Sequence, residues 1–486
     1  MPCKFPEHHA TGRGGLGLLA ALVLAVVLCM HLRFVLEVLT VAAITVLAIA
    51  AAVAVYGAVR LIRRARKTGW RPRIPRLHLP RRVPSWVRHV PRAAWSALRW
   101  HHLTRNLGLA APDRHARGKV RRPRAIILPH SHGITARVRT VPGTGRAEVD
   151  AVAEHIANAW RCTRVSVSQP RPGRVIVRGM KRDPLLAPFG LEAAHSAAVP
   201  RRLYLGRDEH GTDRYADLAN VPGICLGGMP GAGKSTELTS WLTQLAPSAA
   251  VQVALADGKN AGEFDDFEGR AYVMAGDDLD EVINLLEKQH ALMTDRLAAV
   301  RTVLGVKNAW HVGPSAEWPL AVTILDECQS YLDLTAVKGD KTLEPKVRRC
   351  IFLTSSLIRR GRSVMMLTVP ATQKPTTDSL PSSIRDNCPI SLCFGIKTIE
   401  GAAATLGTAI RDYPSYSPVT LADPAYAGCC TATLKTGQDP FTRLRGPYVT
   451  EDQAAAVAVA SAHLRRDPLV SLPVVVPDDV RELVES

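Results

Sequence analysis

The spacing of hydrophobic residues divides the chain into an N-terminal apolar region and a longer part of mixed pattern. Two apolar stretches occupy residues 14–30 and 38–61. The second exceeds the ~20 residues that a membrane-spanning helix needs, and the first is about as short as such a helix can be. Further along, short apolar runs of strand length alternate with segments of helical spacing. This pattern predicts two membrane helices followed by an α/β part.

Basic residues flank both apolar stretches. Lys4 and Arg13 precede the first, and a basic run follows the second: Arg60, Arg63, Arg64, Arg66 and Lys67. By the positive-inside rule, residues 1–62 form a helical hairpin in the cytoplasmic membrane with the rest of the chain in the cytoplasm. The alternative is that the first stretch is a cleaved signal peptide. No cleavage site of the A-x-A kind precedes the second stretch, which favours the hairpin.

Residues 63–124 are rich in Pro and Arg and contain four tryptophans, so we expect a linker. Its tryptophans are Trp70, Trp86, Trp95 and Trp100. Such a mixture suits contact with anionic lipid headgroups or with DNA phosphates. Lipid contact, or a simple topological role, is favoured because Trp next to a membrane helix is an interfacial signal.

Residues 125–185 predict a small α+β adaptor module. Alternating residues indicate strands at 133–141, 164–167 and 175–177, and helical spacing indicates a helix at 148–162. No residues with catalytic spacing occur in this segment.

Residues 186–450 predict an α/β domain with a mostly parallel sheet. Apolar runs at 224–226, 251–256, 320–325, 364–369 and 390–394 alternate with helical segments, notably 235–245 and 278–303. In such doubly wound sheets, ligands bind at the carboxyl ends of the strands. Residues 451–486 are expected to form a short helix and a tail.

A complete phosphate-binding loop follows the first of these strands. The pattern GxxxxGK[ST], with the next residue, comprises Gly228, Met229, Pro230, Gly231, Ala232, Gly233, Lys234, Ser235 and Thr236. Glycines allow backbone N–H groups to surround phosphate oxygens, and the helix that starts here directs its N-terminus at the anion. Lys234 reaches the β- and γ-phosphates, and the Ser235 hydroxyl binds Mg²⁺. ATP and Mg²⁺ are therefore the expected cofactors.

A second strand supplies the carboxylates of such a site. The apolar run at 320–325 ends in Asp326 and Glu327. A carboxylate in the position of Asp326 holds Mg²⁺, and Glu327 is placed to polarise the attacking water as general base. The two halves together predict an ATPase.

Charge and cysteine content refine this assignment. The net charge of +19 is concentrated between Arg60 and Arg124, where Asp113 is the one carboxylate, whereas charges nearly balance beyond Asp183. The ten cysteines show neither a CxxC motif nor zinc-ligand spacing, and several lie in apolar runs. We expect reduced thiols in a reducing compartment.

The order of motifs resembles the FtsK/SpoIIIE family of DNA-pumping ATPases, which belong to the RecA-like P-loop class. Besides the phosphate loop, the matching segments are Leu205-Gly206-Arg207-Asp208, Asp257-Gly258-Lys259, Arg360-Gly361-Arg362-Ser363, Ala371-Thr372-Gln373-Lys374-Pro375, Ser383-Ile384-Arg385-Asp386-Asn387 and Leu444-Arg445-Gly446-Pro447-Tyr448-Val449. The resemblance covers about residues 205–452. It implies a homo-oligomeric, usually hexameric, ring that threads double-stranded DNA. It also implies Gln373 as the sensor of the γ-phosphate and Arg362, two residues from Arg360, as the arginine finger.

Departures from the family pattern narrow the expected role. Ser391 stands where the family has an arginine, and Pro370 replaces an apolar strand residue. About forty residues follow Tyr448, too few for a winged-helix module with its linker. A short, two-span protein of this kind is similar to the actinomycete members that transfer plasmids or mobile elements. The expected function is thus a membrane-anchored DNA translocase with ATP as its sole small-molecule substrate. The alternatives are a chromosome-segregation pump, a motor for type VII-like protein secretion, or a regulatory ATPase that translocates nothing.

Overall fold

The computed structural model describes residues 84–112, 120–192, 200–434 and 440–468. They all belong to one compact unit, residues 83–486. The predicted membrane hairpin at 1–62, the linker up to residue 83 and the end of the tail lie outside the described residues. Among the helices of the described ranges, none is both long and apolar enough to cross a membrane.

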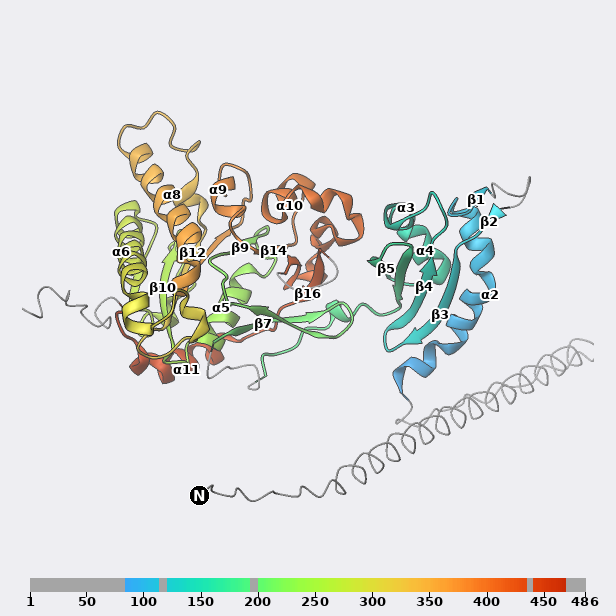
Figure 1. Ribbon diagram of the computed structural model, residues 1–486, viewed down its shortest axis with the longest axis horizontal. Coiled ribbons are helices and arrows are strands. Elements are labelled where there is room, and N and C mark those ends of the chain that lie inside the picture. The colour runs from blue at the N-terminus through green and yellow to red at the C-terminus, as the bar shows by residue number, and fades with distance from the viewer. Residues whose placement is uncertain (1–83, 113–119, 193–199, 435–439, 469–486) are drawn as a thin grey trace, which may run out of the picture. The chain divides into compact units, whose positions relative to one another are not determined.

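The first described part is a four-stranded antiparallel sheet, which we call the module (Figure 1). Its strands lie in the order β3-β4-β6-β5. The core holds Ile134, Ala136 and Val138 of β4, whereas Arg137 and Arg139 between and beyond them are exposed, as the alternation of a strand requires. The elements are η1 (Ser85–His89), α2 (Val90–Asn106), β1 (Ala111–Pro112), β2 (Val120–Arg121), β3 (Arg124–His130), β4 (Gly133–Arg139), α3 (Arg146–Ala151), α4 (Ala153–Trp160), β5 (Arg164–Arg171) and β6 (Arg174–Met180).

Helix α2 lies in the range that the sequence assigns to a linker, and this part of the assignment is wrong. Ala93, Trp100 and Thr104 are buried on one face of the helix. The indole N–H of Trp100 donates to the carbonyl oxygen of Pro123 at 2.8 Å, and its ring lies 6.2 Å from that of Trp160. The helix forms because its buried residues recur at helical spacing, although three arginines and two histidines interrupt the apolar pattern.

The second described part, the motor, is built on a ten-stranded sheet. Its order is β11-β10-β12-β13-β9-β14-β15-β16-β7-β8. The strands from β11 to β14 run parallel, which confirms the predicted α/β architecture, and the remaining four pair antiparallel. Their bounds are β7 (Arg202–Asp208), β8 (Asp213–Asp217), β9 (Ile224–Gly227), β10 (Val251–Asp257), β11 (Val273–Ala275), β12 (Leu320–Asp326), β13 (Met366–Thr372), β14 (Ile390–Phe394), β15 (Cys429–Thr433) and β16 (Thr442–Arg445).

Helices cover the motor sheet and connect its parallel strands (Figure 1). The longest, α6 (Leu279–Leu304), begins where the Asp278 side chain accepts from the N–H groups of Asp280 and Glu281, and ends at Gly305 with φ +66°. Capping of this kind satisfies the free N–H groups of the first turn. The others are α5 (Lys234–Leu245), α7 (Gln329–Leu332), α8 (Leu343–Arg360), α9 (Ser382–Arg385), α10 (Ile399–Leu406) and α11 (Glu451–Ser461).

Strands β10 and β12 lie side by side in the middle of the parallel part, and every residue of both is buried. Burial on both faces explains why they read as continuous apolar runs. Each ends in a carboxylate, and the register pairs Asp257 with Asp326. The carboxyl edge of the sheet is therefore where polar side chains collect.

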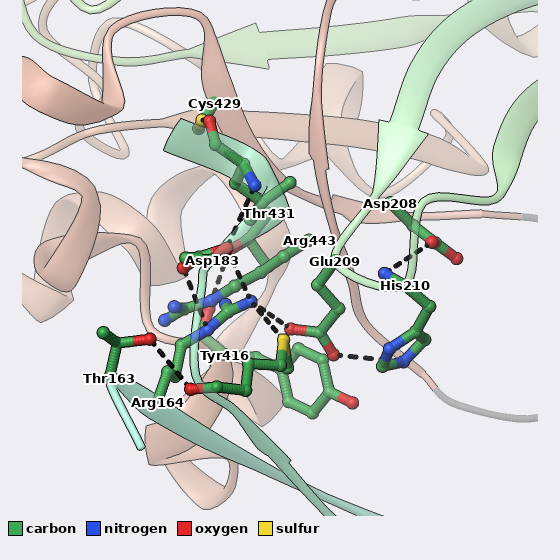
Figure 2. A network of polar contacts seen from close by, with 12 residues as sticks. Thr163, Arg164, Asp183, Asp208, Glu209, His210, Tyr416, Cys429, Thr431 and Arg443 are labelled. Atoms are coloured by element: carbon green, nitrogen blue, oxygen red, sulfur yellow. Dashed lines mark hydrogen bonds and ion pairs between the residues drawn. The ribbon is translucent and has the colours of Figure 1, made fainter. Parts of the chain in front are cut away.

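A buried polar network joins module and motor (Figure 2). Arg164 of β5 pairs with Asp183 at 3.3 Å and with Glu209, next to β7, at 2.8 Å. Burial acts to lower the pKa of Arg164, but the two carboxylates outweigh it and raise that pKa. Burial acts to raise the pKa of Glu209, and Arg164 lowers it overall. We call Arg164, Asp183 and Glu209 the junction network.

The described cysteines are all free. Seven of the eight are buried, and Cys162 is half-buried. The buried thiols pack as small hydrophobic side chains.

Candidate nucleotide-binding site

The loop between β9 and α5 has a backbone that only glycine fits well. Gly231 and Gly233 adopt φ of +74° and +103°. A Cβ on Gly233 would lie 2.6 Å from the Cα of Gly428, and one on Gly228 would lie 2.6 Å from the Cβ of Phe394. The loop therefore curls tightly ahead of the first turn of α5, as a phosphate-binding loop does.

Lys234, the first residue of α5, connects this loop with the end of β12. Its side chain is 3% exposed, and its ammonium group donates to the Asp326 carboxylate and to Glu327 Oε1, the latter at 2.9 Å. Burial acts to lower the pKa of Lys234, but the two carboxylates outweigh this effect and raise it. Lys234 is therefore a charged group in the position where phosphate charge is expected.

Glu327 is held in an unusual backbone conformation. Its φ is +47°, in the left-handed region that costs a non-glycine residue about 1–3 kcal/mol. Its carboxylate accepts from the Gln329 amide, and from the backbone N–H of Gln373 at 3.3 Å. The Thr372 hydroxyl in turn donates to Gln329 Oε1 at 2.7 Å. These bonds fix the carboxylate beside Lys234.

Gln373 directly follows β13, the strand between β9 and β12. It therefore lies between the phosphate loop and the two carboxylates, Asp326 and Glu327. Gln373 lines a pocket of about 430 Å³ at the phosphate loop. Most of the predicted loop residues also line this pocket: Met229, Pro230, Gly231, Gly233, Lys234, Ser235 and Thr236. Four of the five residues predicted as catalytic (Lys234, Asp326, Glu327 and Gln373) are thus brought together.

Arg362 is not part of this assembly. It lies in η6 (Gly361–Val364) after α8, and its side chain is exposed. Its carbonyl oxygen accepts from the Trp310 indole at 2.9 Å. Neither Arg362 nor Arg360 lines the pocket. The assignment of Arg362 to a neighbouring subunit's nucleotide stays a prediction.

One wall of the pocket is not predictable from local sequence. Arg445, Gly446 and Tyr448 lie there beside Glu237 of α5. Their segment matches the closing motif of the family, but nothing local in the sequence links it to the phosphate loop. Glu237 is 2% exposed, accepts from the Trp241 indole at 2.7 Å, and has its pKa raised to about 8 by burial.

The donor set of the pocket fits a magnesium nucleotide. Its volume is within the usual range for small-molecule sites, about 300–1,000 Å³. Ser235 and Asp326 offer the hydroxyl and carboxylate oxygens that Mg²⁺ accepts alongside phosphates and water. The described residues contain no cluster of three or more His, Cys, Asp or Glu side chains that could hold a metal.

Known proteins similar to this chain include curated DNA translocases and a solved conjugation coupling protein. No family model matches the chain. It is 24% identical over 380 residues to DNA translocase FtsK 2 of Ralstonia nicotianae, covering 68% of this chain and 44% of the relative. It is 22% identical over 359 residues to DNA translocase FtsK of Vibrio vulnificus, covering 65% and 34%. The pCW3 conjugation coupling protein TcpA, solved as a monomer with ATPγS, matches with a TM-score of 0.52 at 18% identity, covering 77% of this chain and all of that one.

The fold and the site define a P-loop ATPase. The resemblance to the FtsK/SpoIIIE family, first indicated by the motifs, is confirmed by relatives named DNA translocase FtsK. The chain spans less than half the length of these curated relatives.

Proposed function

We propose that the protein is a membrane-anchored motor that hydrolyses ATP to move double-stranded DNA, in the transfer of plasmid or mobile-element DNA between cells. The observation that carries this proposal is the convergence of Lys234, Asp326, Glu327 and Gln373 on the phosphate loop. Relatives named DNA translocases and a conjugation coupling protein of similar fold support DNA as the substrate.

Each residue of the site has a separate role in hydrolysis. Lys234 exchanges its carboxylate partners for the β- and γ-phosphates when a nucleotide enters, because phosphate oxygens offer it equivalent charge. Ser235 and Asp326 would hold Mg²⁺, whose charge would neutralise that of the phosphates. Glu327, released from Lys234, polarises the attacking water. Gln373, bonded through its N–H to Glu327, passes the loss of the γ-phosphate to β13.

The wider setting is also a proposal. The apolar stretches at 14–30 and 38–61 would anchor the chain in the cytoplasmic membrane with the motor in the cytoplasm. A ring, usually of six subunits in this family, would place Arg362 of one motor at the nucleotide of the next. Exposure of Arg362 and its absence from its own pocket support that role.

The test is ATP hydrolysis by the detergent-solubilised full chain with long duplex DNA, with single strands, and without DNA. We expect strong stimulation by duplex and weaker stimulation by single strands. Lys234→Ala is expected to lower kcat by a hundredfold or more, since it removes a group that contacts the transferred phosphate. Activity that persists in Lys234→Ala would remove the assigned site.

The second candidate is a protein-secretion motor of the type VII kind. The near balance of charges beyond Asp183 favours it mildly, because a DNA pump needs basic residues along its path. Brisk hydrolysis that is indifferent to every form of DNA would retain the ATPase and select this alternative.

A further inference from the structure

The module carries a row of arginines that the motor does not use. Strands β3 to β6 contain seven arginines and no Asp or Glu. Two of the seven have partners: Arg164 belongs to the junction network, and Arg178 bonds the Ser168 hydroxyl at 3.4 Å. The other five lie exposed, and within the described residues no carboxylate pairs with them: Arg124, Arg137, Arg139, Arg171 and Arg174.

The strand register sets four of these side by side. Arg124 of β3 is opposite Arg139 of β4, Arg139 is opposite Arg174 of β6, and Arg174 is opposite Arg171 of β5. With strands about 4.8 Å apart, the row spans roughly 15 Å. Like charges directly opposite one another cost stability in a sheet. Such a row is favourable when an extended anion lies over it.

The row borders a groove rather than a flat surface. A hollow of about 850 Å³ is lined by all five arginines and, from α2, by Ala97 and His101. The one tryptophan of its lining, Trp100, is buried and bonded to Pro123. The aromatic residues that anchor proteins in lipid headgroups are therefore not offered here. Over 15 Å of axis, duplex DNA presents roughly four phosphates per strand.

We propose that this groove, bounded by Arg124, Arg139, Arg171 and Arg174, is a second contact for duplex DNA, separate from the motor and independent of ATP. The inference rests on the proposed function for the identity of the polyanion. Guanidinium groups bind phosphate oxygens in pairs of hydrogen bonds, so a row of them holds a strand backbone without reading its sequence. The groove thus retains DNA while the motor releases it between strokes.

The experiment measures binding of a fluorescent 30-base-pair duplex to the full chain in detergent, without nucleotide, at several salt concentrations. Each phosphate contact contributes about 0.9 to the slope of log affinity against log salt. Arg139→Ala with Arg174→Ala is expected to reduce that slope by about 1.8 and to weaken binding at 0.1 M salt by about tenfold or more. Arg139→Lys with Arg174→Lys, which keeps the charge, should retain the slope.

The matched control removes two arginines that have carboxylate partners, Arg348→Ala with Arg349→Ala in α8. This control changes the net charge by the same amount as the Arg139/Arg174 double variant. The slope of log affinity against log salt should stay near that of the parent. An unchanged slope in the Arg139/Arg174 double variant overturns the proposal while leaving the motor's function standing. No duplex binding by the parent chain without nucleotide overturns the proposal, and no duplex binding with ATP present overturns the proposed function as well. If the Arg139/Arg174 double variant loses binding to phosphatidylserine vesicles but keeps the salt dependence of duplex binding, the groove binds lipid. This result also overturns the proposal.

Discussion

Glu237 is buried with its carboxylate close to Gly446, a residue far away in the chain. By contrast, the positions of Lys234 and Ser235 follow from the spacing of glycines, and that of Asp326 from the end of a buried apolar run. A Cβ on Gly446 would lie 1.8 Å from Glu237 Oε2. Environments made by tertiary contact leave no local signal.

Glu237 makes the stability of the motor depend on pH. Its pKa is raised to about 8, from an ordinary value of 4.5. The folded protein therefore binds a proton that the unfolded chain has lost, so stability falls as pH rises from about 4.5 to 8. Glu237→Gln keeps an acceptor for the Trp241 indole but cannot ionise. We expect its melting temperature to exceed that of the parent by a margin that grows from pH 5 to pH 8, measured by thermal unfolding.

The control for this experiment is Glu263→Gln, which changes an acidic residue of the same pocket whose side chain is exposed. Its unfolding profile should run parallel to that of the parent. Parallel profiles for Glu237→Gln and the parent would instead mean that Glu237 is ionised in the folded protein throughout.

At the scale of elements, the sequence predicts best the strands that are buried on both faces. The parallel strands are predictable because each is an unbroken apolar run. Helix α6 is predictable because its apolar residues recur at helical spacing and Asp278 stands at its N-cap. Strand β16 contains two arginines among its four residues, so it does not read as a strand. Arg443 and Arg445 are nevertheless buried, and they bond carbonyl oxygens of the surrounding loops. The element depends on contacts that no local pattern records.

Helix α2 offers a test of the corrected boundary between linker and module. Trp100 is 3% exposed in the module core, whereas Trp95 on the same helix is 45% exposed. Trp100→Ala is expected to cost about 3–5 kcal/mol, since it deletes a large buried side chain and leaves a cavity. Hydrogen exchange of the full chain should show lost protection in β3 and β4. Trp95→Ala, the control, should change stability by less than about 0.5 kcal/mol; equal effects of the two variants would place α2 outside the module core.

At the scale of the whole described molecule, the junction network connects the module with the motor through buried ion pairs. If the groove of the module holds DNA while the motor moves it, force must be transmitted between the module and the motor. The contacts between them include the junction network and Arg146, which lies over the Tyr413 ring at 3.5 Å and donates to the carbonyl of Asp412 at 2.7 Å. The buried ion pairs are the costlier to break, because each charge would remain inside without a partner.

Arg164→Ala should therefore destabilise the junction by about 3–5 kcal/mol, because Asp183 and Glu209 would stay buried without their cation. The lowered pKa of Glu209 means that this stabilisation is fully present above pH 4.5 and is lost as pH falls through the pKa of the folded state. Denaturant unfolding of parent and variant should accordingly converge at low pH. Adding Glu209→Gln to Arg164→Ala removes one unpaired charge and should restore part of the lost stability. Arg182→Ala, the control at an exposed neighbouring arginine, should have little effect on stability. If Arg164→Ala unfolds like the parent at neutral pH, the junction network is not what holds module and motor together, and Arg146 with Tyr413 becomes the contact to test.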